Sequence, residues 1–187
     1  MLLLFVGACA TDSHSPSTED VGQWQQTAEK LTTLLKEEKF QETENLTKTK
    51  IAELLENAND TEENDTLIKY ARQILSISYY NYLKSKQFRS GIEYMDSLSQ
   101  IPFIHENCKH ELLSARASMH QMYGDNKQAI ELADEYLQLP DYEDADRFIP
   151  QAEIISGVYI YSGNDIPQAI RILEKAMKAY RQGGKYR

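Results

Sequence analysis

The sequence is poor in the residues that interrupt regular structure. Only eight glycines and five prolines are spread over 187 residues, and long stretches contain neither. A fold of many short strands needs frequent turns, so this scarcity favours helices. Two cysteines, Cys9 and Cys108, are too few for a disulfide framework. With 41% hydrophobic and 26% charged residues, the composition is typical of a soluble fold, and we expect the all-α class.

The chain also lacks a surplus of positive charge. It has 20 Lys and Arg residues against 29 Asp and Glu residues, which gives a net charge of −9. Non-specific binding to nucleic acid requires a basic face against the phosphates. The sequence therefore predicts no nucleic-acid partner.

Catalytic motifs are missing as well. No G-x-S-x-G nucleophile elbow occurs, and Gly183-Gly184-Lys185 lacks the spacing and the Ser or Thr of a phosphate loop. The sequence thus predicts neither catalytic residues nor a cofactor. A small enzyme is the last of three functional hypotheses.

One cluster contains side chains of the types that bind metals, namely His105, Cys108, His110 and, further on, His120. His105 and Cys108 are three residues apart and could share a helix face. Cys108 and His110 are two apart, so an unbroken helix would place them on nearly opposite faces. A tetrahedral site would therefore need a broken helix here. The alternative is a helix start with exposed histidines and a buried cysteine, and we predict no metal site.

The N-terminus reads MLLLFVGACA, an apolar run followed by small residues and Cys9. The run is much shorter than the roughly 20 residues that span a bilayer. The stretch VGAC resembles the lipobox of bacterial lipoproteins. This resemblance implies that residues 1–9 are a signal remnant, that Cys9 is lipidated, and that residues 10–19 form a flexible tether. No Lys or Arg precedes the apolar run, and an accidental cysteine is the alternative.

A lipidated Cys9 would place the protein in the bacterial cell envelope, facing the periplasm or on the outer membrane. The lipid would be its only contact with the membrane.

From Val21 onwards, apolar residues recur at helical spacing. We expect eight helices in four antiparallel hairpins within residues 20–187. Their expected ranges are 21–35, 46–55, 67–83, 88–102, 106–123, 127–137, 145–161 and 166–182.

The turns inside these hairpins resemble one another. They read EKFQETENL, KQFRSGIEYM, GDNKQAIELA and NDIPQAIRIL, with Thr43, Gly91, Ala129 and Ala169 at equivalent small positions. These positions are 48, 38 and 40 residues apart. A single hairpin cannot bury its apolar face alone, so a recurring turn indicates hairpins that stack on one another.

This pattern resembles the tetratricopeptide repeat, a helix–turn–helix unit of about 34 residues. The resemblance implies a right-handed α-solenoid of about four hairpins. Close-packing positions carried over from the family are Phe88, Gly91, Ala117, Ala129, Gly157, Ala169, Leu173 and Ala176. The spacings here are longer than in the family, the first hairpin fits poorly, and a non-repetitive helical bundle is the alternative.

In that family the first helix of each hairpin lines a concave groove. Carried over, the register predicts groove residues Tyr80, Leu83, Lys84, Ser118, Gln121, Met122, Val158 and Tyr161. For Tyr80 and Tyr161, packing between helices is an equal alternative to exposure in the groove.

The leading functional hypothesis is a non-enzymatic scaffold of the bacterial envelope that binds a protein or peptide in this groove. The alternative is the N-terminal sensory segment of a larger signalling protein, a sensor histidine kinase or a transcriptional regulator, similar to tetratricopeptide proteins of the Bacteroides group. The genomic sequence beyond Arg187 would discriminate between the two.

Overall fold

A computed structural model describes residues 18–58, 65–140 and 145–182, and these are all-α. The described residues form nine α-helices and one π-helical segment, η1, and contain no strand. The helices are α1 (Thr18–Lys36), α2 (Phe40–Ala58), α3 (Asp65–Lys84), α4 (Phe88–Ser99), α5 (Pro102–Asn107), α6 (Lys109–Tyr123), α7 (Asn126–Leu137), α8 (Ala145–Val158) and α9 (Ile166–Gln182), with η1 (Tyr159–Gly163) between the last two.

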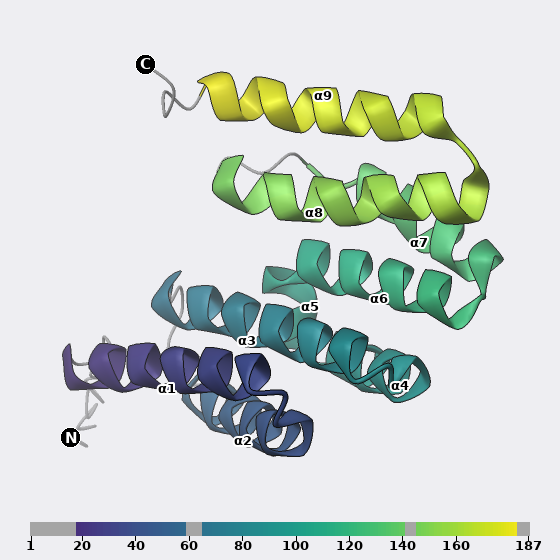
Figure 1. Cartoon of the computed structure of the whole chain (residues 1–187). Helices are drawn as coiled ribbons and strands as arrows, with labels where there is room; N and C mark the ends of the chain where they lie inside the picture. The colour runs from purple at the N-terminus through teal and green to yellow at the C-terminus, as the bar shows by residue number, and fades with distance from the viewer. Residues whose placement is uncertain (1–17, 59–64, 141–144, 183–187) are drawn as a thin grey trace, which may run out of the picture.

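The helices form pairs that follow one another in chain order. Short turns join α1 to α2, α3 to α4, α6 to α7, and α8 with η1 to α9. The first helices of the pairs, α1, α3, α6 and α8, each contact the next, and α1 and α9 lie at opposite ends of the molecule (Figure 1). Each second helix also contacts the first helix of the following pair, namely α2 with α3, α4 with α6, and α7 with α8.

The three earlier turns share one backbone geometry. A residue in the left-handed region ends each first helix, with φ of 58° at Glu38, 57° at Lys86 and 95° at Gly124. The next N–H then donates to the carbonyl five residues back: Lys39 to Leu34 (2.9 Å), Gln87 to Tyr82 (3.0 Å) and Asp125 to His120 (2.9 Å). These bonds define a Schellman cap, which satisfies carbonyls left open at a helix end. The turn predicted from sequence therefore recurs as a structural unit.

The fourth turn contains one extra residue. Asn164 has φ of 51°, and the Asp165 N–H donates to the Tyr159 carbonyl six residues back (3.0 Å). The π-helical segment η1 accommodates this longer loop. The acceptor carbonyls of these turn bonds belong to His120 and Tyr159, so α8 aligns with α6 with a one-residue shift in which Val158 corresponds to Met119 rather than to Ser118.

The helix expected over 106–123 is divided in two. Pro102 is the first residue of α5, a position that its missing N–H and fixed φ favour, and Cys108 separates α5 from α6. The Arg72 guanidinium donates to the carbonyl of Asn107 at 2.7 and 2.9 Å, which satisfies a backbone oxygen freed by this break. The prediction of a single helix here was wrong.

Two apolar clusters form the core. The first cluster contains residues from α1 through α6, and the second contains residues from α6 through α9. Helix α6 therefore contributes to both. Most of the predicted packing positions are buried, namely Gly91, Ala117, Ala129, Ala169 and Ala176, while Phe88 and Leu173 are half-buried. Gly157 does not fit its expected role, because a Cβ added there would meet nothing within 4 Å.

Candidate binding surface

Helix α3, the first helix of the second pair, exposes a row of side chains on one side. Lys69, Gln73, Tyr80 and Lys84 are exposed and are separated by about one or two helical turns, which places them on one side of the helix. The face lies beside α1 at one end and α6 at the other, because α3 contacts both helices. We call this face, with the adjoining exposed residues of α1, α6 and η1, the first-helix surface.

A hollow of about 520 Å³ lies at the α1 end of the first-helix surface. Its walls carry Gln25, Glu29, Thr32 and Lys36 from α1 and Lys69 and Gln73 from α3. Tyr70 also lines it, and its ring stacks on Trp24 with the centroids 5.5 Å apart. Amide, hydroxyl, ammonium and carboxylate groups together can donate to and accept from a peptide backbone.

Tyr80 and its neighbour Tyr79 have different environments. The Tyr79 hydroxyl lies 2.9 Å from Ser118 Oγ in a buried contact between α3 and α6, and burial raises the pKa of Tyr79. The Tyr80 ring packs at a tilt against Tyr79, 5.0 Å between centroids, yet remains 40% exposed. Tyr79 therefore holds two helices together, whereas Tyr80 offers an aromatic ring to solvent.

The other expected groove residues divide into exposed and buried groups. Met122 and Tyr161 are exposed, Tyr161 at 74%, and Lys84 is exposed too. Gln121 and Leu83 are half-buried, and Leu83 packs against the core.

Ser118 and Val158 do not belong to the groove as predicted. Ser118 is buried against Tyr79, and Val158 is completely buried in the second apolar cluster. After the one-residue shift Val158 corresponds to Met119, and both side chains are completely buried.

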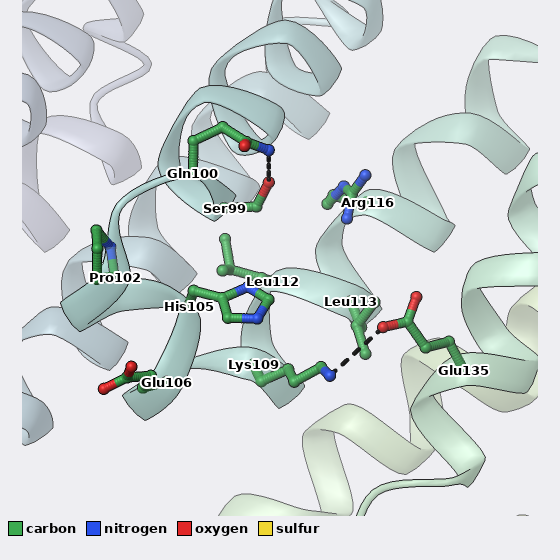
Figure 2. A pocket seen from close by; sticks show the side chains of 10 residues that line it. All are labelled: Ser99, Gln100, Pro102, His105, Glu106, Lys109, Leu112, Leu113, Arg116 and Glu135. Carbon is green, nitrogen blue, oxygen red and sulfur yellow. Dashed lines mark hydrogen bonds and ion pairs between the residues drawn. The ribbon is translucent and has the colours of Figure 1, made fainter.

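A second hollow, of about 490 Å³, lies between the end of α4, α5, α6 and α7 (Figure 2). His105, Lys109 and Arg116 line it. Each long cation already has a carboxylate: Lys109 Nζ lies 3.6 Å from Glu135, and Arg116 Nε lies 2.7 Å from Asp96. The local charges are therefore matched within the protein, and this hollow has no excess of positive charge for an anion.

The four side chains of metal-binding type lie in different surroundings. Cys108 is completely buried, and His105 is exposed in the second hollow. His110 Nε2 lies 2.9 Å from the Pro140 carbonyl, and His120 Nδ1 lies 3.4 Å from Asp125. Among residues 18–58, 65–140 and 145–182, no three His, Cys, Asp or Glu side chains are grouped as a metal site would require.

Buried tyrosine hydroxyls link one helix pair to the next. Tyr82 on α3 donates to Glu44 on α2 at 3.0 Å, and Tyr159 donates to Asp134 on α7. Burial, followed by the hydrogen bond to the carboxylate, raises the pKa of both tyrosines. Burial likewise raises the pKa of Tyr94 to about 12. These groups stabilise the stack and lie in it rather than on the first-helix surface.

Comparison of the chain with protein-family models, with curated proteins and with solved structures found no match. In the part of the chain that the structure describes, no helix combines the length and the apolar character needed to cross a bilayer. Cys9 and the lipobox lie outside the described residues, as does most of the expected tether. The helix α1 begins at Thr18, so it contains the last two residues of the expected tether.

Proposed function

We propose that the protein is a non-enzymatic scaffold that binds a segment of another protein on its first-helix surface. In this proposal the helix pairs form a right-handed, tetratricopeptide-like solenoid, and the first-helix surface is its concave side. The repeated Schellman turns and the contacts between successive first helices support this architecture.

The observation that carries the proposal is the combination of an exposed aromatic ring and a polar hollow on one face. Tyr80 provides apolar area with a polar tip, which suits a protein interface. The hollow between α1 and α3 adds amide and hydroxyl groups for a bound backbone. Its positive side chains, Lys36 and Lys69, outnumber Glu29 there, so we expect a segment with acidic residues or a free carboxylate.

We further propose that the protein acts at the bacterial cell envelope, attached through a lipid on Cys9. The lipobox-like residues carry this part of the proposal. In cells given a labelled fatty acid, the wild-type chain should incorporate label and Cys9→Ser should not. Label that persists in Cys9→Ser would disprove attachment at this residue.

The binding proposal is tested by selecting short random peptides on the immobilised chain and measuring their affinity for variants. Tyr80→Ala and Tyr161→Ala should each weaken the selected peptides by about tenfold, the loss of a well-placed aromatic contact. Arg89→Ala and Lys127→Ala, exposed changes on the second helices α4 and α7, are the matched controls and should leave the affinity unchanged. Equal losses in both groups would contradict the proposal.

A further inference from the structure

Helix α9 is apolar on two faces. Ala169, Ile172 and Ala176 are buried in the second apolar cluster. A second row of apolar side chains follows the spacing of one helix face. This row consists of Ile166, Ile170, Leu173 and Met177 and is called the α9 stripe; Ile166, Ile170 and Met177 are 53%, 50% and 52% exposed.

In the three earlier pairs, the face of the second helix that corresponds to the α9 stripe is covered by the next pair. Counting four residues on from the small turn positions Thr43, Gly91 and Ala129 gives Thr47, Met95 and Ala133, and all three are buried. The helices that contact these faces are the first helices of the following pairs.

The third helix pair shows most directly how this face is buried by the element that follows it. Ile130 and Leu137 of α7, the counterparts of Ile170 and Met177, pack against the core. A Cβ on Gly163 of η1 would lie only 3.0 Å from Ile130 Cδ1, so the following element is in close contact with this face. Leu173 of α9, the counterpart of Ala133, is by contrast only half-buried.

We propose that the α9 stripe is a docking site for an amphipathic helix of another polypeptide, which takes the position that α8 with η1 takes on α7. The docked helix carries an apolar row against the α9 stripe and acidic residues along one flank. This site is separate from the first-helix surface and does not depend on the function proposed for that surface.

The acidic flank follows from the charges beside the stripe. Arg171, Glu174, Lys178 and Arg181 are exposed and lie along one side of it, because each is about 100° or less around the helix from a stripe residue. Three positive charges against one negative charge give this side a local charge of +2, in a chain whose net charge is −9. Charge complementarity therefore selects a partner with Asp or Glu opposite this flank.

A second copy of the chain fits this site poorly. Two antiparallel α9 helices would bring their positive flanks together, which is unfavourable. Head-to-tail stacking would require an apolar outer face on α1, but from residue 23 onwards the exposed residues of α1 are polar: Gln23, Gln25, Gln26, Glu29, Lys30, Thr33 and Lys36.

The other segments of residues 1–187 do not fit the site either. Residues 59–64, 141–144 and 183–187 number six, four and five, too few for two helical turns. Residues 1–17 contain a single acidic residue, Asp12. Within residues 1–187, therefore, no other segment matches the helix that the site selects.

The test uses two fluorescent helical peptides of about 18 residues, long enough for five turns. Both carry the same row of leucines; one has glutamates along a flank and the other has lysines there. Anisotropy with the full chain should show the acidic peptide binding about tenfold more tightly than the basic one. Equal binding of the two peptides, or no binding, would overturn the proposal.

Two variants locate the binding. Ile170→Gln with Met177→Gln should abolish binding of the acidic peptide. Arg171→Glu with Lys178→Glu should reverse the preference, so that the basic peptide binds more tightly, and an unfolded chain could not produce this reversal. Binding that neither double variant alters would overturn the proposal.

Separate controls distinguish this site from the first-helix surface and from self-association. The acidic peptide should bind Tyr80→Ala as tightly as the wild type, and peptides selected for the first-helix surface should still bind Ile170→Gln with Met177→Gln. Sedimentation of the chain alone should show a monomer. A dimer that Ile170→Gln with Met177→Gln dissociates would assign the α9 stripe to a second copy instead.

Discussion

At the residue scale, a missing side chain lets α4 approach its neighbours closely. A Cβ added to Gly91 would lie 2.6 Å from Met119 Sδ and 2.9 Å from Tyr82 Cβ, too close for either to stay in place. A Cβ added to Gly157, by contrast, would have no atom within 4 Å. The sequence identified both as close-packing positions, but one-dimensional spacing cannot show the one-residue shift that η1 produces in α8.

Alanine at these two glycines should therefore have opposite effects on stability. Gly91→Ala should lower the free energy of unfolding by about 1–3 kcal/mol, the usual cost of overpacking. Gly157→Ala should raise it by roughly 0.5–1 kcal/mol, because alanine favours the helix without a clash. Urea denaturation followed by far-UV circular dichroism measures both, and changes of the same sign would refute this account of Gly91.

The buried tyrosines predict a pH dependence. A tyrosine in the unfolded chain ionises near pH 10, whereas the pKa of Tyr94 in the folded chain is about 12 and those of Tyr82 and Tyr159 are also raised. Above about pH 10 the folded state thus binds more protons, so the free energy of unfolding should fall from there to about pH 12. Tyr82→Phe with Tyr159→Phe should flatten this fall in denaturation curves, and an unchanged slope would contradict it.

At the element scale, the turns were predictable and the helix breaks were not. The recurring YGDNKQAI and YSGNDIPQAI motifs place Asp125 and Asp165 at helix starts, and their carboxylates accept the N–H of Gln128 at 3.3 Å and of Gln168 at 2.9 Å. The break at Cys108 carries neither Gly nor Pro, and Arg72 donates to the carbonyl of the adjacent Asn107, 35 residues away in the sequence. Local sequence cannot reveal a contact so distant in the chain.

The helix caps lead to a prediction at this scale. Asp165→Ala should lower the free energy of unfolding by about 1 kcal/mol, because the Gln168 N–H loses its acceptor. Asp165→Asn should retain most of the stability, since asparagine caps almost as well. Thermal denaturation of both variants decides the matter, and equal losses would show that the cap hydrogen bond is not the cause.

At the scale of the whole molecule, the stack has two unlike ends. The outer residues of α1 are polar, whereas the α9 stripe is apolar. Periodicity predicted the helix pairs and their order, and the all-α class is confirmed. The partner could not be predicted, because exposure of Tyr80 or Tyr161 depends on how neighbouring helices cover each ring, and several expected groove residues proved to be half-buried or buried.

An open stack predicts a long separation between its ends. Spin labels at Lys30 on α1 and Lys178 on α9, introduced with Cys9→Ser, should be much farther apart than labels at Lys30 and Gln73 on the neighbouring α3. Pulsed electron resonance measures both distances. Similar distances for the two pairs would indicate a closed bundle instead.

If the first helices carry the binding surface, site-specific crosslinking should attach a selected peptide to them. A photoreactive phenylalanine analogue would replace Tyr80 or Tyr161 on this surface, or Glu93 or Glu131 on the second helices α4 and α7. We expect crosslinked peptide at the first two positions, identified by mass spectrometry, and none at the other two. Crosslinks confined to Glu93 and Glu131 would contradict it.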